Sequence, residues 1–464
     1  MDTLDVDVAI IGAGTAGLSA RRAAQKAGAR ALLIDRGPLG TTCARVGCMP
    51  SKLLIAAAEA AEAVREAHHF GVHPPGPARV AGPEVLARVQ RERDRFVSFV
   101  LDDCRVLQES GDLVLGTAKL VEPHVLTIDG ARRVRFRSLV VATGSSPFLA
   151  PEYCELHDRV LTNDGIFELR DLPKRVLVVG TGAIGLELGQ ALHRLGVGVT
   201  ILGHRGILGH LSDPAVRAAA HKIFTADLDL HPDHTLERIA RGGDGVVATF
   251  KTPDGRTHDG TWDHVLLAAG RRPLTANLGL ELAGLTFDER SRPHNVDPHT
   301  LRAGDSHIFF AGDVAGIHPI LHEAADEGHI AGTNAAAHPN VTPHPRRCEL
   351  SLVFTDPNIA IVGGGFNNSP PSSHAHGEVD WTRQGRARVL HKNRGLTRVY
   401  GRRSDHVLTG AEMVGPHAEH LAHLIAWVVQ QNLTVEAALA LPFYHPVLEE
   451  GLRTALRDLE HNLS

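Results

Sequence analysis

The chain has 464 residues, and its 48 Lys and Arg against 53 Asp and Glu give a formal net charge of −5 at pH 7. At roughly 150 residues per domain, this length predicts about three domains, and the charge offers no basic excess to attract nucleic acid or an anionic membrane. Glycine is over-represented, with 47 residues, which is about a tenth of the chain where roughly 7% is usual.

The sequence lacks the features of exported and membrane proteins. No apolar stretch reaches the roughly 18–20 residues of a membrane helix, and the first residues, Met1–Asp5, are acidic where a secretory signal is basic. The 5 cysteines are too few for a disulfide scaffold and suggest a reducing compartment, so we expect a cytoplasmic protein. The 30 histidines are scattered, and because His68-His69 and His374/His376 lack partners at metal-ligand spacing, we expect surface histidines and no metal site.

The first predicted elements surround a glycine-rich turn. An apolar run of strand type, Val6–Ile11, leads into the motif Gly12–Gly17, and an Ala-rich helix is expected over Leu18–Ala27. A second strand, Ala31–Ile34, ends at Asp35. Strand, turn, helix, strand and acid together form the context that a dinucleotide-binding fingerprint requires.

Each residue of this fingerprint has a physical task. Gly12 makes the turn, Gly14 lets backbone N–H groups approach a pyrophosphate, and Gly17 lets the helix pack on the strand. The positive end of the helix then faces the phosphates, and Asp35 is placed to accept hydrogen bonds from ribose hydroxyls. The alternative is a glycine turn between packed elements that binds nothing.

Two cysteines five positions apart, Cys43 and Cys48, open an Ala-rich segment that extends to about Ala67. They could form a disulfide, bind a metal or be buried, and no second Cys/His pair at zinc spacing follows. On a straight α-helix such residues have Cα atoms about 8–9 Å apart, whereas a disulfide needs about 4.4–6.8 Å. A bridge therefore requires a distorted helix, which Gly47 permits, and in a reducing compartment it indicates redox catalysis.

The glycine fingerprint occurs a second time. The strand Arg175–Val179 leads into Gly180–Gly185, followed by a predicted helix over Leu186–Leu195 and a strand over Val197–Leu202. An acid is expected after that strand, but Gly203-His204-Arg205 stands there instead. Without the carboxylate a clear preference for NAD is lost. Arg205 either meets the 2′-phosphate of NADP or is an ordinary surface arginine, so the nicotinamide cofactor stays open.

The C-terminal half contains fewer local signals. The segment Gly363–Gly377 predicts a flexible loop because it contains Asn-Asn-Ser-Pro-Pro-Ser-Ser, and the apolar Leu421–Val429 predicts a helix suited to an interface. Near the end, Pro446 is expected at the first position of a helix. His445 would then precede that helix, and Glu450 would lie in its second turn.

Seven motifs, in order along the chain, resemble those of the flavin-dependent pyridine nucleotide–disulfide oxidoreductases. They are Gly40–Lys52, Ala142–Ser145, Gly180–Gly189, Ala268–Pro273, Ala311–Asp313, Phe354–Gly363 and Tyr444–Glu450. Within this family the sequence most resembles the dihydrolipoamide dehydrogenases, because Ser51-Lys52 follows Pro50, both cysteines are present, and the tail Leu452–Ser464 contains no cysteine.

The resemblance implies FAD and NAD(P) as cofactors and gives roles to the catalytic residues. Cys48 is the sulfur beside the flavin, and Cys43 is the outer sulfur that exchanges with substrate. His445 is the base for this exchange, oriented by Glu450, whereas a histidine before proline is otherwise commonly a surface residue or helix cap. The catalytic set implied by the resemblance is completed by an ion pair beside the flavin's hydride-accepting nitrogen, formed by Lys52 and Glu187.

The cofactor-binding residues implied by the resemblance lie in both fingerprints and in the motif turns. For the flavin they are Gly12, Gly14, Gly17, Asp35, Lys52, Thr143, Gly144, Gly270 and Asp313. For the nicotinamide dinucleotide they are Gly180, Gly182, Gly185 and Arg205. Three residues depart from the family pattern: Thr41 replaces a usual glycine, Val447 a usual threonine, and Gly203 the acid of the NAD-using dehydrogenases.

The implied fold is α/β, with two Rossmann-like dinucleotide-binding domains and a C-terminal α+β dimerisation domain. The expected ranges are residues 1–150 for FAD, 151–272 for NAD(P), 273–345 for a central segment returning to the FAD domain, and 346–464 for the interface domain. In this family the histidine serves the disulfide of the other subunit, so a homodimer is expected. The implied substrate is a small dithiol or disulfide, such as the lipoyl groups of a multienzyme complex. The alternatives are an NADPH-dependent, glutathione reductase-like enzyme and a low-turnover flavin-binding redox sensor.

Overall fold

The computed structural model describes residues 3–464, so Met1 and Asp2 of the acidic start lie outside it. The described chain divides into two compact units. Unit 1 contains residues up to Pro50, Gln90–Phe148 and Gly270–Arg346, and unit 2 contains Ser51–Val89, Leu149–Ala269 and Arg347–Ser464. Within residues 3–464, no helix has the length and apolar character needed to cross a membrane.

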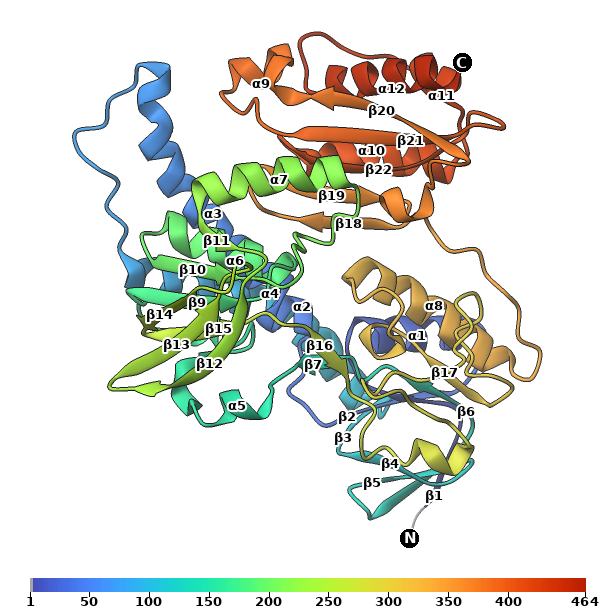
Figure 1. Ribbon diagram of the computed structural model, residues 1–464. Coiled ribbons are helices and arrows are strands. Elements are labelled where there is room, and N and C mark those ends of the chain that lie inside the picture. The colour runs from blue at the N-terminus through green and yellow to red at the C-terminus, as the bar shows by residue number, and fades with distance from the viewer. Residues whose placement is uncertain (1–2) are drawn as a thin grey trace. The chain divides into compact units, whose positions relative to one another are not determined.

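Unit 1 is built on a mainly parallel sheet (Figure 1). Its strands are β1 (Thr3–Ile11), β2 (Ala31–Asp35), β3 (Leu113–Leu115), β4 (Ala118–Glu122), β5 (Val125–Ile128), β6 (Arg132–Val141) and β17 (Ile308–Phe310). They lie in the order β3-β2-β1-β6-β5-β4, and β17 pairs in parallel with β6. The central strands are buried on both faces, which is why their sequences are continuous apolar runs.

Two helices of unit 1, α1 (Thr15–Lys26) and α8 (Leu321–Ala337), pack closely against each other. A Cβ atom on Gly328 would collide with the carbonyl of Ala16, and one on Gly332 with the carbonyl of Ala20. The two backbones can approach this closely only because both α8 positions lack side chains. The central segment of the chain thus holds the first helix of the chain against its sheet.

The predicted strand–turn–helix–strand context of the first fingerprint is confirmed. β1 ends at Ile11, α1 begins at Thr15, and β2 begins at Ala31 in parallel with β1. The helix begins three residues before the predicted Leu18, because the Leu18 N–H already donates to the Gly14 carbonyl at 2.9 Å. A short antiparallel pair in the same unit, β7 (Ser145–Pro147) and β16 (Arg271–Pro273), joins two of the motifs.

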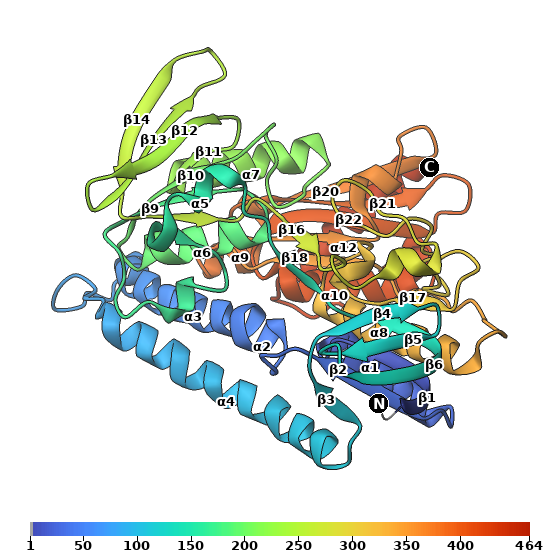
Figure 2. The ribbon, with the colours of Figure 1, turned by 90° about the horizontal axis from the view of Figure 1, so that it is seen from below.

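Unit 2 contains a second parallel sheet, in the order β11-β10-β9-β15-β8. Its strands are β8 (Val160–Leu161), β9 (Arg175–Val179), β10 (Gly198–Leu202), β11 (Asp229–His231) and β15 (His264–Leu267). The helices α6 (Ala183–Arg194) and α7 (Pro214–Asp227) follow β9 and β10, so the second fingerprint also has its predicted context. Figure 2 shows a separate small antiparallel sheet of β12 (Thr235–Gly242), β13 (Gly245–Lys251) and β14 (Thr257–Trp262).

The C-terminal part of unit 2 is an antiparallel sheet in the order β18-β19-β22-β21-β20. Its strands are β18 (Leu350–Val353), β19 (Asn358–Val362), β20 (His374–Asp380), β21 (Leu396–Arg402) and β22 (Leu408–Gly415). Directly paired residues such as Ala360 and Met413 point to the same face. That face forms one core with both α10 (Ala418–Gln430) and α12 (Glu450–Leu463).

The remaining helices connect these sheets. They are α2 (Thr42–Val46), α3 (Cys48–Glu66), α4 (Gly82–Glu109), α5 (Pro151–Cys154), α9 (Gly385–Val389) and α11 (Val435–Leu439). Residues 51–89, which the sequence analysis places with the FAD domain, group with unit 2. The reason is apolar packing, since Leu54, Ile55 and Leu86 belong to the same core as Leu186 and Ala191 of α6.

Two expectations for the C-terminal half are wrong. The segment Gly363–Gly377 is not a continuous flexible loop, because residues 365–368 form a 3-10 turn and His374–Gly377 begin strand β20, paired with β21. The last helix begins at Glu450 rather than at Pro446, so Glu450 lies in its first turn. The predicted helix over Leu421–Val429 is present within α10, but Leu421, Ala422 and Ile425 face the core of the sheet.

The contact between β20 and α12 leaves no room for a side chain at Gly377. A Cβ atom there would collide with the Ala455 carbonyl and with the backbone of Leu459. We expect Gly377→Ala to lower the free energy of unfolding by about 1–3 kcal/mol, as overpacking does. Urea unfolding measures this, with Gly385→Ala as the control, since nothing lies within 4 Å of a Cβ atom at Gly385. Equal stability of both variants would contradict the packing described.

Candidate functional site

The first glycine turn leaves a cradle at the start of α1. A Cβ atom on Gly12 would collide with the Ala142 carbonyl, and one on Gly17 with the Gly12 carbonyl, so both glycines are required by close backbone approach. Gly14 differs, because a Cβ atom there would meet nothing within 4 Å. The open space lies at the helix N-terminus, where main-chain N–H groups attract phosphate. This arrangement fits a dinucleotide pyrophosphate.

Asp35, at the end of β2, holds the same turn. Its carboxylate accepts hydrogen bonds from the backbone N–H groups of Ala13 and Gly37, both at 2.6 Å. A carboxylate has about four acceptor sites, so these two bonds leave capacity for ribose hydroxyls. Asp35 therefore fixes the shape of the turn in addition to the binding role predicted for it.

A second polar group of unit 1 surrounds Asp313. Its carboxylate accepts a hydrogen bond at 2.6 Å from the Ser145 hydroxyl, which in turn accepts one at 2.8 Å from Nε of Arg271. The preceding residue, Gly312, has a φ of 80°, and a Cβ atom there would lie 3.0 Å from the Cβ of Ala16 in α1. The Asp313 backbone thus lies next to the first turn of α1, which suits contact with the same dinucleotide.

The motif turns around Thr143, Gly144 and Gly270 tie the two crossing segments of unit 1 together. The Thr143 hydroxyl donates to the Leu274 carbonyl at 2.7 Å, and the Gly144 carbonyl accepts from the Leu274 N–H at 3.0 Å. Gly144 and Gly270 have φ values of 72° and 110°, conformations that glycine adopts without strain.

The two cysteines flank a break between helices. α2 ends at Val46, α3 begins at Cys48, and Gly47 between them is non-helical, with φ −122° and ψ −116°. The helix distortion at Gly47 that a Cys43–Cys48 bridge would need is therefore present. Cys43 is half-buried and Cys48 is exposed at the first position of α3, where a helix N-terminus favours a thiolate.

Thr41, the departure from the usual glycine, has a φ of 60°. This left-handed region is unfavourable for a β-branched residue, which explains why glycine is the family's usual residue. In compensation the Thr41 hydroxyl accepts a hydrogen bond from the Ala44 N–H at 3.3 Å and caps α2.

The second glycine turn, in unit 2, repeats the geometry of the first. Cβ atoms on Gly180 and Gly185 would collide with the carbonyls of Ala268 and Gly180, whereas the nearest atom to one on Gly182 would be His210 Nε2 at 3.7 Å. Backbone approach at Gly182 therefore remains possible, which fits a second dinucleotide.

The missing acid of the second fingerprint has a steric reason. A Cβ atom on Gly203 would lie 2.7 Å from Cγ2 of Thr181 and 2.8 Å from the backbone of Pro232. The place of the acid is thus filled by neighbouring atoms. Arg205 is exposed, with a φ of 54°, and stands three residues beyond Leu202, the end of β10, in the region where Rossmann folds bind the ribose.

The ion pair implied for Lys52 and Glu187 is present in unit 2. Lys52 Nζ lies 2.8 Å from Glu187 Oε2, and the Glu187 residue is only 6% exposed. The other carboxylate oxygen accepts the Phe354 N–H at 3.0 Å, and the Phe354 ring centre lies 4.2 Å from Lys52 Nζ. Phe354 therefore contacts both charges, through its backbone and as a cation–π partner.

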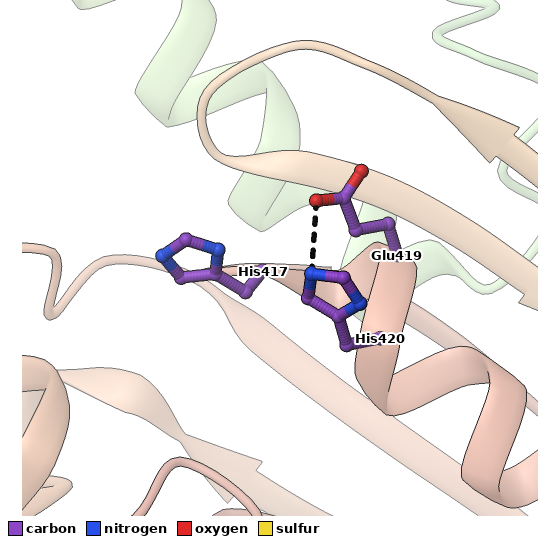
Figure 3. A group of neighbouring side chains, drawn as sticks. All are labelled: His417, Glu419 and His420. Carbon is purple, nitrogen blue, oxygen red and sulfur yellow. Dashed lines mark ion pairs between the residues drawn. The ribbon is translucent and has the colours of Figure 1, made fainter.

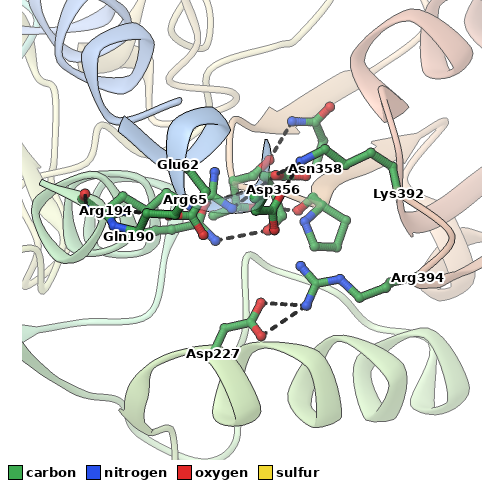
Figure 4. A network of polar contacts seen from close by, with 12 residues as sticks. Glu62, Arg65, Gln190, Arg194, Asp227, Asp356, Asn358, Lys392 and Arg394 are labelled. Carbon is green, nitrogen blue, oxygen red and sulfur yellow. Dashed lines mark hydrogen bonds and ion pairs between the residues drawn. The ribbon is translucent and has the colours of Figure 1, made fainter. Parts of the chain in front are cut away.

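Helix α6 continues these contacts along one face. Gln190, one turn after Glu187, exchanges two hydrogen bonds with the backbone of Asp356, at 2.8 and 3.0 Å. The Asp356 carboxylate pairs with Arg194 at 3.0 Å and with Lys392 at 2.7 Å (Figure 4). Burial acts to raise the pKa of Asp356, but the two cations outweigh it and hold the pKa below its ordinary value.

His445 and Glu450 also meet in unit 2. Nδ1 of His445 lies 3.0 Å from one carboxylate oxygen of Glu450 and 3.1 Å from the other. The Val447 N–H donates to the same carboxylate at 3.2 Å. The hydrogen bond from His445, followed by that from Val447, lowers the pKa of Glu450. With Nδ1 directed to the carboxylate, Nε2 is the nitrogen available to take a proton.

The sequence analysis did not single out Ser145, Arg271 or Phe354 as site residues. All three stand inside motifs that it quoted, but their contacts join segments more than a hundred residues apart in the chain. Motif membership was the available signal, and only the three-dimensional pairing shows what each side chain contacts.

Comparison with known proteins places these sites in one family. The family described as "Pyridine nucleotide-disulphide oxidoreductase" matches residues 6–328, and its dimerisation domain matches residues 350–456. The chain belongs to this family. It is an enzyme of that family, with FAD and a nicotinamide dinucleotide as cofactors, and the dimerisation domain supports a homodimer.

Relatives cover nearly the whole chain. A dihydrolipoyl dehydrogenase 3 from Pseudomonas aeruginosa is 30% identical, and the match covers 98% of this chain and 97% of that protein. A dihydrolipoyl dehydrogenase 3 from Haloarcula marismortui is 28% identical, with the same coverage of 98% and 97%. A mercuric reductase from Staphylococcus aureus is also 28% identical, covering 99% of this chain and 83% of its own.

Solved structures have the same fold. The crystal structure of LpdA from Mycobacterium tuberculosis has a TM-score of 0.81 at 27% identity, covering 97% of this chain and 99% of its own. The flavoprotein disulfide reductase RclA from Escherichia coli has a TM-score of 0.80 at 22% identity and the same coverage of both chains, 97% and 99%. At that identity RclA shows the fold alone.

The crowding at Gly203 generates a prediction about cofactor choice. Gly203→Glu restores an acid after β10, but its Cβ has no space between Thr181 and Pro232. We expect a loss of about 1–3 kcal/mol in stability from overpacking and weaker binding of both NADH and NADPH, measured by thermal unfolding and by titration. The control is His204→Glu, which adds the same charge at an exposed position. Tighter NADH binding without loss of stability would show that the steric explanation is wrong.

Proposed function

We propose that the protein oxidises a small dithiol, with dihydrolipoamide as the first candidate, and transfers the electrons to a nicotinamide dinucleotide. The observation that carries this proposal is the His445–Glu450 pair, 3.0 Å apart, on a chain that also has both cysteines at a helix break. A base paired with a carboxylate suits thiol–disulfide exchange, because the thiolate is the attacking species. The inference that the enzyme acts in the cytoplasm rests on the small number of cysteines.

In this proposal FAD binds to unit 1, and the nicotinamide dinucleotide binds to residues 149–269 of unit 2. Gly14, Asp35 and Asp313 would hold the flavin nucleotide. The nicotinamide dinucleotide would be held by Gly180–Gly185 and Arg205. When bound, the flavin supplies the two-electron chemistry between nicotinamide and dithiol. The Lys52–Glu187 pair is assigned to the flavin's hydride-accepting nitrogen by the family resemblance, and its low exposure would strengthen its field there.

The thiol chemistry is assigned to the two cysteines and the base. Cys43 would exchange with the substrate, while Cys48, at the start of α3, gains from the helix dipole as a thiolate. His445 would take the substrate proton at Nε2, and Glu450 would hold the ring and stabilise its positive charge. The His445 side chain is 80% exposed in the single chain, which supports the proposal that it serves the disulfide of a second subunit.

A second candidate is an NADPH-linked reductase of another small disulfide. It is favoured by the filled space at Gly203 and by the exposed Arg205 beyond it, which suit a 2′-phosphate better than a free hydroxyl. Steady-state rates with both nicotinamides and a panel of disulfides separate the two candidates. A redox sensor, the third possibility, would accept electrons from NAD(P)H without turnover of any disulfide in the panel.

The dithiol proposal is tested with the flavin-loaded enzyme. We expect wild type to oxidise dihydrolipoamide and Cys48→Ser to lose that activity, because the electron path from dithiol to flavin is broken. Cys154→Ser is the control, since Cys154 is exposed and lies far from the motif in the sequence. Equal dihydrolipoamide oxidation by wild type and Cys48→Ser would rule out the proposal.

The roles of His445 and Glu450 are tested by rapid kinetics. Loss of a general base lowers rates by on the order of 10²- to 10⁴-fold, so we expect His445→Gln to slow flavin reduction by the dithiol in that range and Glu450→Gln to slow it less. Flavin reduction by NAD(P)H should stay unchanged in both. Glu449→Gln, one residue away, is the matched control. A variant that slows both half-reactions equally would indicate a structural role instead.

A further inference from the structure

The start of α10 brings together three side chains that can bind a metal ion. His417, Glu419 and His420 each offer one ligand atom, and these atoms all lie within 4.8 Å of one another. Figure 3 shows the Glu419 carboxylate in ion-pair contact with His420, at 3.3 Å from Nε2, with the His417 ring beside them. None of these residues belongs to the site described above.

The backbone creates this cluster. His417 stands before the first turn of α10 with φ 49° and ψ 36°, in the left-handed region, which turns its side chain toward the helix that follows. The rings of His417 and His420 are nearly parallel, at 18°, with centres 6.2 Å apart. The His417 ring thus lies beside Glu419 and His420, with one of its nitrogens within 4.8 Å of their ligand atoms.

One further carboxylate, that of Glu59, interacts electrostatically with the cluster. Loss of water around Glu59 of α3 raises the pKa of that carboxyl, and the negative charges of Asp356 and Glu419 raise it further, although Arg194 and Lys392 act in the opposite direction. Glu419 thus stands close enough to Glu59 for their charges to repel. The positive end of the α10 dipole opposes a cation, and the Glu419 carboxylate within the cluster offsets that effect.

We propose that His417, Glu419 and His420 form a binding site for a divalent first-row transition cation such as Zn²⁺. Two imidazoles with one carboxylate are a ligand set that zinc accepts, with a position left for water or a further ligand. Ligands about 2.0–2.1 Å from a tetrahedral ion lie about 3.4 Å apart. Because His417 and His420 are exposed, small side-chain rotations can close the cluster around the ion.

The test is a calorimetric titration of the full-length flavin-loaded enzyme with ZnCl₂. We expect one zinc ion per chain at micromolar concentrations, and a loss of about tenfold or more in affinity in His417→Ala and in His420→Ala. The matched control is His423→Ala, an exposed histidine one turn further along α10 that is outside the cluster, and its affinity should stay unchanged. The same titration in a Cys43→Ser/Cys48→Ser variant excludes zinc binding by the thiols.

Cobalt gives an independent readout. Co²⁺ at the site should produce visible absorption bands that are absent from His420→Ala, while unchanged thermal unfolding shows that the variant is folded. The proposal is overturned if wild type shows no saturable zinc binding, if the two cluster variants bind as wild type does, or if His423→Ala weakens binding as much as they do.

Discussion

A carboxylate removed from water must find several partners, since an unpaired buried charge costs several kcal/mol, and unit 2 is organised by this constraint. Glu412 of β22 is fully buried and accepts N–H groups from Ser212, Asp213 and Phe366 at 2.9 to 3.0 Å. Asp213, also fully buried, accepts the hydroxyl of Tyr400 at 3.0 Å and pairs with Arg398 at 3.3 Å. These bonds join the segment after β10 to the antiparallel sheet.

The same constraint explains why one face of α6 is bonded to the segment before β19. Glu187, Gln190 and Arg194 lie on one helix face and are all bonded to the short segment Phe354–Asp356. A carboxylate with both oxygens engaged cannot change rotamer without breaking a bond in a poorly hydrated place. The Lys52 ammonium therefore faces Glu187, whose position is set by the C-terminal domain. The chemistry assigned to this pair thus depends on the contact of Glu187 with Phe354, far along the sequence.

Local sequence patterns predicted the parts that depend on local physics. Glycine spacing located both turns, and the spacing of Cys43 and Cys48 implied that a bridge between them would need a helix break, which is present at Gly47. Local patterns did not predict the structure of segments whose conformation is determined by contacts with residues distant in the sequence. The pairing with β21 makes His374–Gly377 a strand despite the prolines before it, and the His417 cluster depends on a left-handed backbone that no spacing rule indicates. The absence of an acid at Gly203 was visible in the sequence, but its cause, the atoms of Thr181 and Pro232, was not.

The glycines beneath α12 bear on how this protein can diverge. Gly377 and Gly401 lie against Leu459 of that helix, and Gly451 within it lies against the Trp381 ring. Because α12 begins at Glu450, a larger side chain at any of these three glycines would shift the helix. The carboxylate that orients His445 would move with it. The glycines at these three positions are therefore expected to stay fixed as the protein diverges, since each limits how close the helix that carries Glu450 can lie to its neighbours.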